Sequence, residues 1–286
     1  MGENVVNVEN NAVTKLYRHD CDYNSCPTRY SKFSDIDAEQ ENLRNGMTDV
    51  PIIHRHVFEE KKWITESFTV QNPSMRAHLQ VALAKYQDFD LELENWTFTE
   101  PYKPIVHRWD RLNALCNTTT EPQGKQAIDQ LMEFLRPIVA PSVDSLAQTR
   151  KSGKVCFNDV WQIFPPGELA VTSFFGVPAV CRVLQYEKHE PRGLPPSWIV
   201  TLEYLDWNGE HCGYTTTKTK ITYFKGFRFV ASLSVFPLSF SQSAAQIKSR
   251  TIERGRKFEK LRGYHFRVCV GTKVLLETEE PEERPV

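Results

Sequence analysis

The sequence predicts a protein of the α+β class, with an antiparallel sheet of about six strands, packed helices and a helical N-terminal region. Two observations lead to this prediction. Up to about residue 150, apolar residues recur mainly at helical spacing. After residue 155, short apolar and β-branched runs alternate with turn residues. Helices grouped before strands are typical of α+β proteins, so we expect a meander that either stays open or closes in a barrel-like manner.

The first elements follow a polar segment. Residues 1–50 are rich in Asn, Asp and Glu and show no sustained period, which predicts a mobile or loosely attached tail. In residues 62–70, Trp63, Thr65, Ser67 and Thr69 alternate with Ile64, Glu66, Phe68 and Val70, and this period of two predicts a strand. Pro73 then opens a predicted helix, since proline is favoured at the first helical position.

A longer helical region follows. Residues 125–139 place Ile and Leu on one helical face and predict a helix. Pro137 falls late in this pattern, so we expect it to kink or end the helix. Pro141 and Gly153 bracket a second predicted helical stretch.

The C-terminal half is predicted to be rich in strands. Trp161 belongs to a short amphipathic turn at 157–164, where we expect it to have a structural role. Asn208 and Gly209 form the strongest hairpin signal, because both residue types tolerate positive φ, and Gly209 is therefore a candidate structural residue. The predicted strands cover residues 169–175, 179–187, 198–206, 211–224 and 227–238.

A helix over residues 243–261 and a strand over 266–270 complete the prediction. Gly255 and Phe258 lie on the apolar stripe of the helix, so we expect Gly255 to permit close approach to the sheet and Phe258 to anchor it. The predicted domain covers residues 51–272, with a helical part (51–150) and a β-rich core (151–272). Residues 273–286 are an acidic tail.

Composition restricts the class of protein. The formal net charge is −1, so no global field recruits nucleic acid or a membrane surface. The N-terminus has no apolar stretch typical of a signal peptide, and no run approaches the roughly 20 apolar residues of a membrane span. Seven scattered cysteines indicate free thiols in a reducing compartment. We therefore expect no membrane partner and a cytoplasmic or nuclear location.

Known catalytic and cofactor patterns do not occur in the sequence. The two Gly-Lys pairs, at Gly124 and Gly153, lack the hydroxyl residue and the upstream glycine of a phosphate-binding loop. His19, Cys21 and Cys26 lie close together, but they lack zinc-ligand spacing. We predict no catalytic, cofactor-binding or metal-binding residues and no cofactor. The alternative that stays open is an enzyme whose Cys/His or carboxylate site is assembled by the fold.

A basic stretch is the main candidate binding feature. Residues 246–267 carry eight Lys and Arg against two Glu. Arg250, Arg254 and Lys257 lie on one helical stripe beside the apolar face. Such a stripe is either a solvated helix face, or a docking face for an acidic partner or for nucleic-acid phosphates. A third possibility is masking by the acidic tail.

Four blocks in order carry a resemblance to a known family. They are FNDVWQIFPPGELAV, LEYLDWNGEHCGY, ITYFKGFRFVASLSVFPLSF and RTIERGRKFEKLRGYHFRVCVG. Together with an upstream block they resemble, over about residues 55–272, a domain of unknown function found N-terminal to the ATPase module of filamentous-fungal AAA+ proteins. The resemblance implies an accessory recognition domain, and no catalytic residue is carried over by it. No ATPase module follows the resembling region here.

The sequence therefore predicts a non-catalytic adaptor or substrate-recognition domain. The expected partner is a protein, and the resemblance implies an AAA+ ATPase acting in trans. The alternatives are the fold-assembled enzyme and a binder of anionic partners or nucleic acid through residues 246–267, with nucleic acid the less favoured partner.

Overall fold

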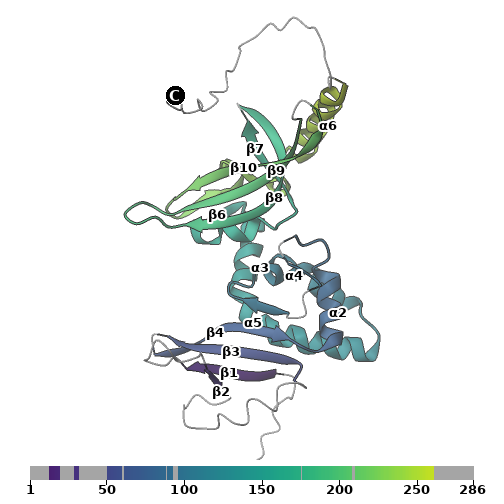
Figure 1. Cartoon of the computed structure of the whole chain (residues 1–286), viewed down its shortest axis with the longest axis vertical. Coiled ribbons are helices and arrows are strands. Elements are labelled where there is room, and N and C mark those ends of the chain that lie inside the picture. Colours follow the sequence, from purple (N-terminus) through teal and green to yellow (C-terminus); the bar gives the residue numbers. More distant parts are fainter. Residues whose placement is uncertain are drawn as a thin grey trace, which may run out of the picture.

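The structure, a computed structural model, describes residues 13–19, 29–31, 50–59, 61–87, 89–92, 96–174, 176–207 and 210–260. A first sheet lies at one end of the molecule, helices occupy the middle, and a second sheet lies at the other end (Figure 1). Mixed helices and antiparallel sheets confirm the predicted α+β class.

The first sheet contains part of the segment expected to be a tail. Its order is β2-β1-β3-β4-β5, with bounds Arg29–Ser31, Val13–His19, Ile52–Glu59, Lys62–Val70 and Thr97–Thr99. β1 runs parallel to β3, and its Leu16 is only 1% exposed. Arg18 forms an ion pair with Glu66 of β4, and the Tyr30 hydroxyl donates to the same carboxylate at 2.7 Å. Residues 13–19 are thus a strand, which corrects the expectation of a loosely attached segment there.

Four helices pack next to this sheet. They are α2 (Pro73–Ala82), α3 (Lys103–His107), α4 (Trp109–Thr118) and α5 (Pro122–Ser152). α2 begins as predicted at Pro73, where the Asn72 side chain accepts a hydrogen bond from the backbone N–H of Met75. Met75 and Leu79 turn inward and are fully buried.

α5 is one continuous helix of 31 residues. The expectation that the helix ends at Pro137, with a second helix after Pro141, is therefore wrong, whereas a kink at Pro137 stays a prediction. Both prolines are exposed, so the carbonyls that lose a helical partner lie on the solvent side, while Leu131, Leu135 and Val139 are buried on the other side. Packing of this inward face outweighs the loss of two hydrogen bonds.

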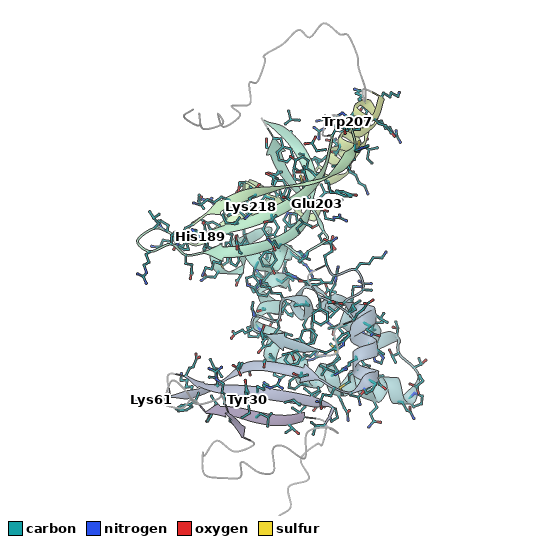
Figure 2. The ribbon with its side chains drawn as sticks, in the orientation of Figure 1. Tyr30, Lys61, His189, Glu203, Trp207 and Lys218 are labelled. Atoms are coloured by element: carbon teal, nitrogen blue, oxygen red, sulfur yellow. The ribbon has the colours of Figure 1, made fainter. Side chains whose placement is uncertain are left out.

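The second sheet is an antiparallel meander, as predicted. Its order is β10-β9-β8-β7-β12, with bounds Cys212–Thr222, Ser197–Trp207, Val177–His189, Leu169–Phe174 and Phe236–Pro237. Figure 2 shows His189 and Trp207, the last residues of β8 and β9, at opposite ends of this sheet. A separate ribbon pairs β6 (Lys154–Cys156) with β11 (Phe227–Phe229). The described strands thus form three sheets rather than one sheet of about six strands.

The predicted run over residues 227–238 is not one strand. It contains β11, the short helix η2 (Val230–Ser232), β12 and the start of η3 (Leu238–Phe240). Between them, the Ser234 hydroxyl donates to the Lys220 carbonyl of β10 at 2.7 Å, and the Ser234 carbonyl accepts from Thr172 of β7 at 3.3 Å. This segment therefore links the two sides of the meander by hydrogen bonds, without closing a barrel.

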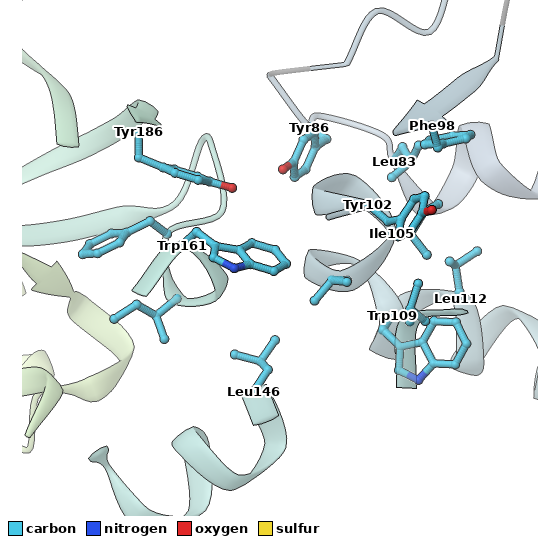
Figure 3. Close-up of a cluster of buried hydrophobic side chains, with 14 of the residues drawn as sticks. Leu83, Tyr86, Phe98, Tyr102, Ile105, Trp109, Leu112, Leu146, Trp161 and Tyr186 are labelled. Atoms are coloured by element: carbon cyan, nitrogen blue, oxygen red, sulfur yellow. The ribbon is translucent and has the colours of Figure 1, made fainter. Parts of the chain in front are cut away.

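One hydrophobic core joins the two halves of the molecule. Its members include Leu83 and Ile105 from the helical half and Val183 and Val200 from the second sheet. Figure 3 shows Tyr86, Leu146, Trp161 and Tyr186 gathered at the junction. The short helix η1 (Phe157–Ile163) supplies Trp161, and α5 supplies Leu146.

Candidate binding surfaces

The predicted basic helix is present as α6, from Ala244 to Lys260. It contacts β8 of the second sheet and the short helix η3, and it projects beyond that sheet (Figure 1). Arg254 donates from its guanidinium to the Pro178 carbonyl at 2.8 Å, and Lys257 pairs with Glu253 at 3.0 Å. Arg250 is exposed. The three candidate residues therefore divide into one that fastens the helix to the sheet and two on the open surface.

The apolar stripe of α6 is not buried as expected. No residue of α6 is fully buried by the described part of the chain. A side-chain carbon added at Gly255 would meet no described atom within 4 Å, and Phe258 is 39% exposed. The structural roles predicted for Gly255 and Phe258 are therefore corrected. Among the described residues of the stripe, Ala244, Ile247 and Thr251, in the first half of the helix, are partly covered.

Trp161 lies at the junction of the two halves, where it is 6% exposed. Its backbone carbonyl is 3.1 Å from Nε2 of His107, and the two rings are tilted with centroids 5.7 Å apart. Burial lowers the pKa of His107 to about 3, so this side chain is neutral at physiological pH. His107 acts here as a buried hydrogen-bonding link between α3 and η1.

Gly209 lies outside the described residues, as does the predicted strand over 266–270. The strands that flank Gly209 are described: β9 and β10 pair antiparallel from Cys212 opposite Trp207 to Thr222 opposite Ser197. The candidates His19, Cys21 and Cys26 are not described as side chains.

Other titratable groups form small clusters. Burial raises the pKa of the Cys181 thiol to about 11, which keeps it protonated. At the surface, Lys125 pairs with Asp129 at 2.7 Å, and the Cys116 thiol donates to the same carboxylate at 3.3 Å. Burial, followed by this hydrogen bond, raises the pKa of Cys116. Among the described residues, no group of three or more His, Cys, Asp and Glu side chains is arranged to hold a metal ion.

A second exposed surface, absent from the sequence-based candidates, lies on the β6–β11 ribbon. Phe227 is 73% exposed and Phe229 58% exposed, although both are apolar. The ammonium of Lys154 lies 4.8 Å from the centre of the Phe229 ring, and the guanidinium of Arg228 lies 4.7 Å from the centre of the Phe224 ring. The ribbon thus presents aromatic rings next to cations.

A sequence signal for this surface exists. Residues 211–252 contain six Lys and Arg but no Asp or Glu. Within that stretch, the sequence KGFRFV at residues 225–230 places two aromatic residues two positions apart on one strand. Basic residues are denser in the helix than in this strand, so composition alone points to the helix.

Comparison with known proteins gives one match. Residues 145–242 match the model of a family described as a domain of unknown function (DUF7025). The matched segment extends from within α5 to just beyond η3, so it includes the β6–β11 ribbon and ends before α6. No curated protein and no solved structure matches the chain. No described helix is long and apolar enough to cross a membrane.

Proposed function

We propose that this protein is a non-catalytic recognition domain that docks an acidic protein partner on α6. The observation that carries the proposal is the exposure of α6. Its six Lys and Arg stand against two Glu, and both Ile252 and Phe258 are exposed between them. Exposed apolar side chains flanked by cations are the usual contents of a docking helix.

The attachment of α6 supports this role. Arg254 holds the helix to the β7–β8 hairpin at Pro178, and Ile247 and Thr251 are partly covered. Beyond these contacts, the described part of the chain leaves the C-terminal turns of the helix uncovered. A helix fixed at one half and open at the other offers a partner a preorganised surface, which lowers the entropic cost of binding.

The buried titratable groups support a non-catalytic reading. A general base needs a free lone pair facing a substrate, but both ring nitrogens of His107 lie within hydrogen-bond distance of protein atoms. A nucleophilic cysteine needs thiolate character, but the pKa of both Cys116 and Cys181 is raised. We further propose, from the resemblance of the sequence blocks, that the partner is an AAA+ ATPase.

The test places a photo-crosslinking amino acid at Phe258 in the full chain and, as a control, at Phe58, an exposed residue of β3. We expect an AAA+ ATPase to be crosslinked from position 258 in cells and not from position 58. Reversal of Arg250 and Lys257 to Glu, which leaves the Arg254 anchor in place, should abolish the crosslink. The matched control reverses two other exposed cations, Lys62 and Arg136, and should leave it intact.

Two results would contradict the proposal. The first is a crosslink that survives the reversal on α6, because the cations would then not contribute to docking. The second is magnesium-dependent ATP hydrolysis by the purified chain that a point substitution in the chain abolishes, because the domain would then be an enzyme itself.

A further inference from the structure

We propose that the β6–β11 ribbon binds single-stranded nucleic acid, with bases stacked on Phe227 and Phe229 and phosphates held by Lys154 and Lys225. This goes beyond the proposed function, because it assigns a second surface and a second class of partner. It also differs from the sequence-based expectation, which considered nucleic acid only for the basic helix.

The geometry of the two phenylalanines carries the proposal. Residues two apart on a strand point to the same face, and their Cα atoms are about 6.6 Å apart. Phe227 and Phe229 are in this relation on β11, opposite Cys156 and Lys154 of β6. Each ring therefore has room for its own base. Stacking on exposed aromatic side chains is how proteins hold single strands without strong sequence preference.

The local sequence supports the same interpretation. The RNA-recognition motif carries its base-stacking aromatics in a strand with the pattern basic, Gly, aromatic, small, Phe, Val, any residue, aromatic. Residues 225–232, KGFRFVAS, follow this pattern at the first, second, third, fifth and sixth positions. They depart from it at Arg228, where the pattern has a small residue, and at Ser232, where it has an aromatic residue.

The structure accounts for both departures. Arg228 lies opposite Val155 in the ribbon, and its guanidinium lies over the Phe224 ring in an exposed position, so no small residue is needed there. Ser232 lies in η2, after the strand has ended, so an aromatic residue there would not lie beside Phe227 and Phe229 on the strand. Val230, the sixth position, is fully buried and anchors the strand. β11 pairs with β6 alone among the described strands, so the likeness is local to the strand.

The charge pattern favours nucleic acid over an acidic protein segment. Lys154 lies beside Phe229, and Lys225 lies two residues before Phe227. Each nucleotide brings a phosphate and a flat base together, so it satisfies both kinds of group at once. An acidic peptide would satisfy the cations but would leave the rings exposed to water.

The test measures fluorescence anisotropy of labelled 12-nucleotide single strands, one of RNA and one of DNA, with the full chain. A 12-base-pair duplex and a polyglutamate peptide serve as competitors. We expect single strands to bind, with an affinity that falls as salt increases. Replacement of each Phe by Leu should weaken binding by about fivefold to about 150-fold, whereas replacement of both by Trp should preserve it. The RNA and DNA arms show which nucleic acid is preferred.

Matched variants keep the result interpretable. Tyr214→Leu removes another highly exposed aromatic from the second sheet and should leave binding unchanged. Thermal melting of each variant verifies folding, since exposed rings contribute little to stability. The proposal is overturned if the Leu variants bind as tightly as the parent, if duplex or polyglutamate competes as well as single strand does, or if only the reversal on α6 removes binding.

Discussion

The hydroxyl of Tyr86 lies 2.7 Å from Nδ1 of His107 at the centre of the molecule. Nε2 of the same ring faces the Trp161 carbonyl, which can only accept, so Nε2 carries the hydrogen and Nδ1 accepts from Tyr86. One neutral tautomer therefore ties the segment after α2, the helix α3 and η1 together. These two hydrogen bonds therefore join the helical half of the protein to the half that contains the second sheet.

Substitution of Tyr86 by Phe should destabilise the protein by about 1–3 kcal/mol. The change leaves a buried ring nitrogen without its donor while it keeps the packing of the ring. Urea unfolding followed by tryptophan fluorescence measures the loss. Tyr214→Phe, at an exposed position, is the control and should change the free energy of unfolding by less than about 0.5 kcal/mol. Equal effects at the two positions would mean that the Tyr86–His107 hydrogen bond contributes nothing.

Stability should fall as the pH decreases from the ordinary histidine pKa of about 6.5. The unfolded chain takes up a proton there, whereas burial lowers the pKa of His107 in the folded protein to about 3. The unfolded state therefore binds more protons between these two values, and stability is lost progressively across this window. The slope contributed by His107 should approach 1.4 kcal/mol per pH unit.

His107→Gln should flatten this dependence, because Gln does not titrate. His54, whose pKa is also lowered to about 3, first by burial and then by His56, will retain part of the slope. Urea unfolding at pH values from 8 to 5 gives both curves. A parent and variant with the same slope would show that His107 is not the titrating group.

Glu66→Ala should loosen β1 and β2. This carboxylate accepts from both Arg18 of β1 and Tyr30 of β2, and so ties both strands to β4 by polar contacts. Hydrogen exchange detected by mass spectrometry should show faster exchange at residues 13–18 in the variant. Glu59→Ala, at an exposed position of β3, should leave their exchange rate at the parent value. If residues 13–18 exchange as slowly in the Glu66 variant, backbone pairing with β3 alone holds them.

Truncation of two phenylalanines should have very different effects. Phe164 is completely buried, so Phe164→Ala should cost roughly 3–5 kcal/mol. Phe258 is 39% exposed, so Phe258→Ala should cost about 1 kcal/mol or less, and its effect should appear in partner crosslinking instead. Urea unfolding curves of both variants give the two changes in the free energy of unfolding. A loss at Phe258 as large as that at Phe164 would mean that α6 packs more deeply than the described contacts indicate.

The sequence predicted best where a pattern is local and one face is buried. The runs that became β7 to β10 alternate with period two or carry β-branched residues between clear turns, so their pairing follows from the chain itself. α2 was predicted from Pro73 for the same reason. Its cap and its apolar positions lie within a few residues of each other.

The incorrect predictions concern elements whose structure depends on contacts with residues far away in the sequence. Leu16 shows that β1 is a strand only once β3 is beside it, some forty residues later. Pro137 is tolerated in α5 because the surrounding core holds the inward face, which no window around the proline reveals. In α6 the apolar stripe has the right period but no cover, because periodicity records which face could be buried and not whether anything buries it.

The start of the matched family segment falls inside α5, so the segment is smaller than the part of the chain that shares one hydrophobic core. The matched segment starts at residue 145, inside this helix, yet its Trp161 and Tyr186 both contact the ring of His107, which lies outside the segment. A protein cut at residue 145 would expose these rings to water and lose most of the helix. In this chain the residues before 145, His107 among them, are therefore needed to cover one side of Trp161.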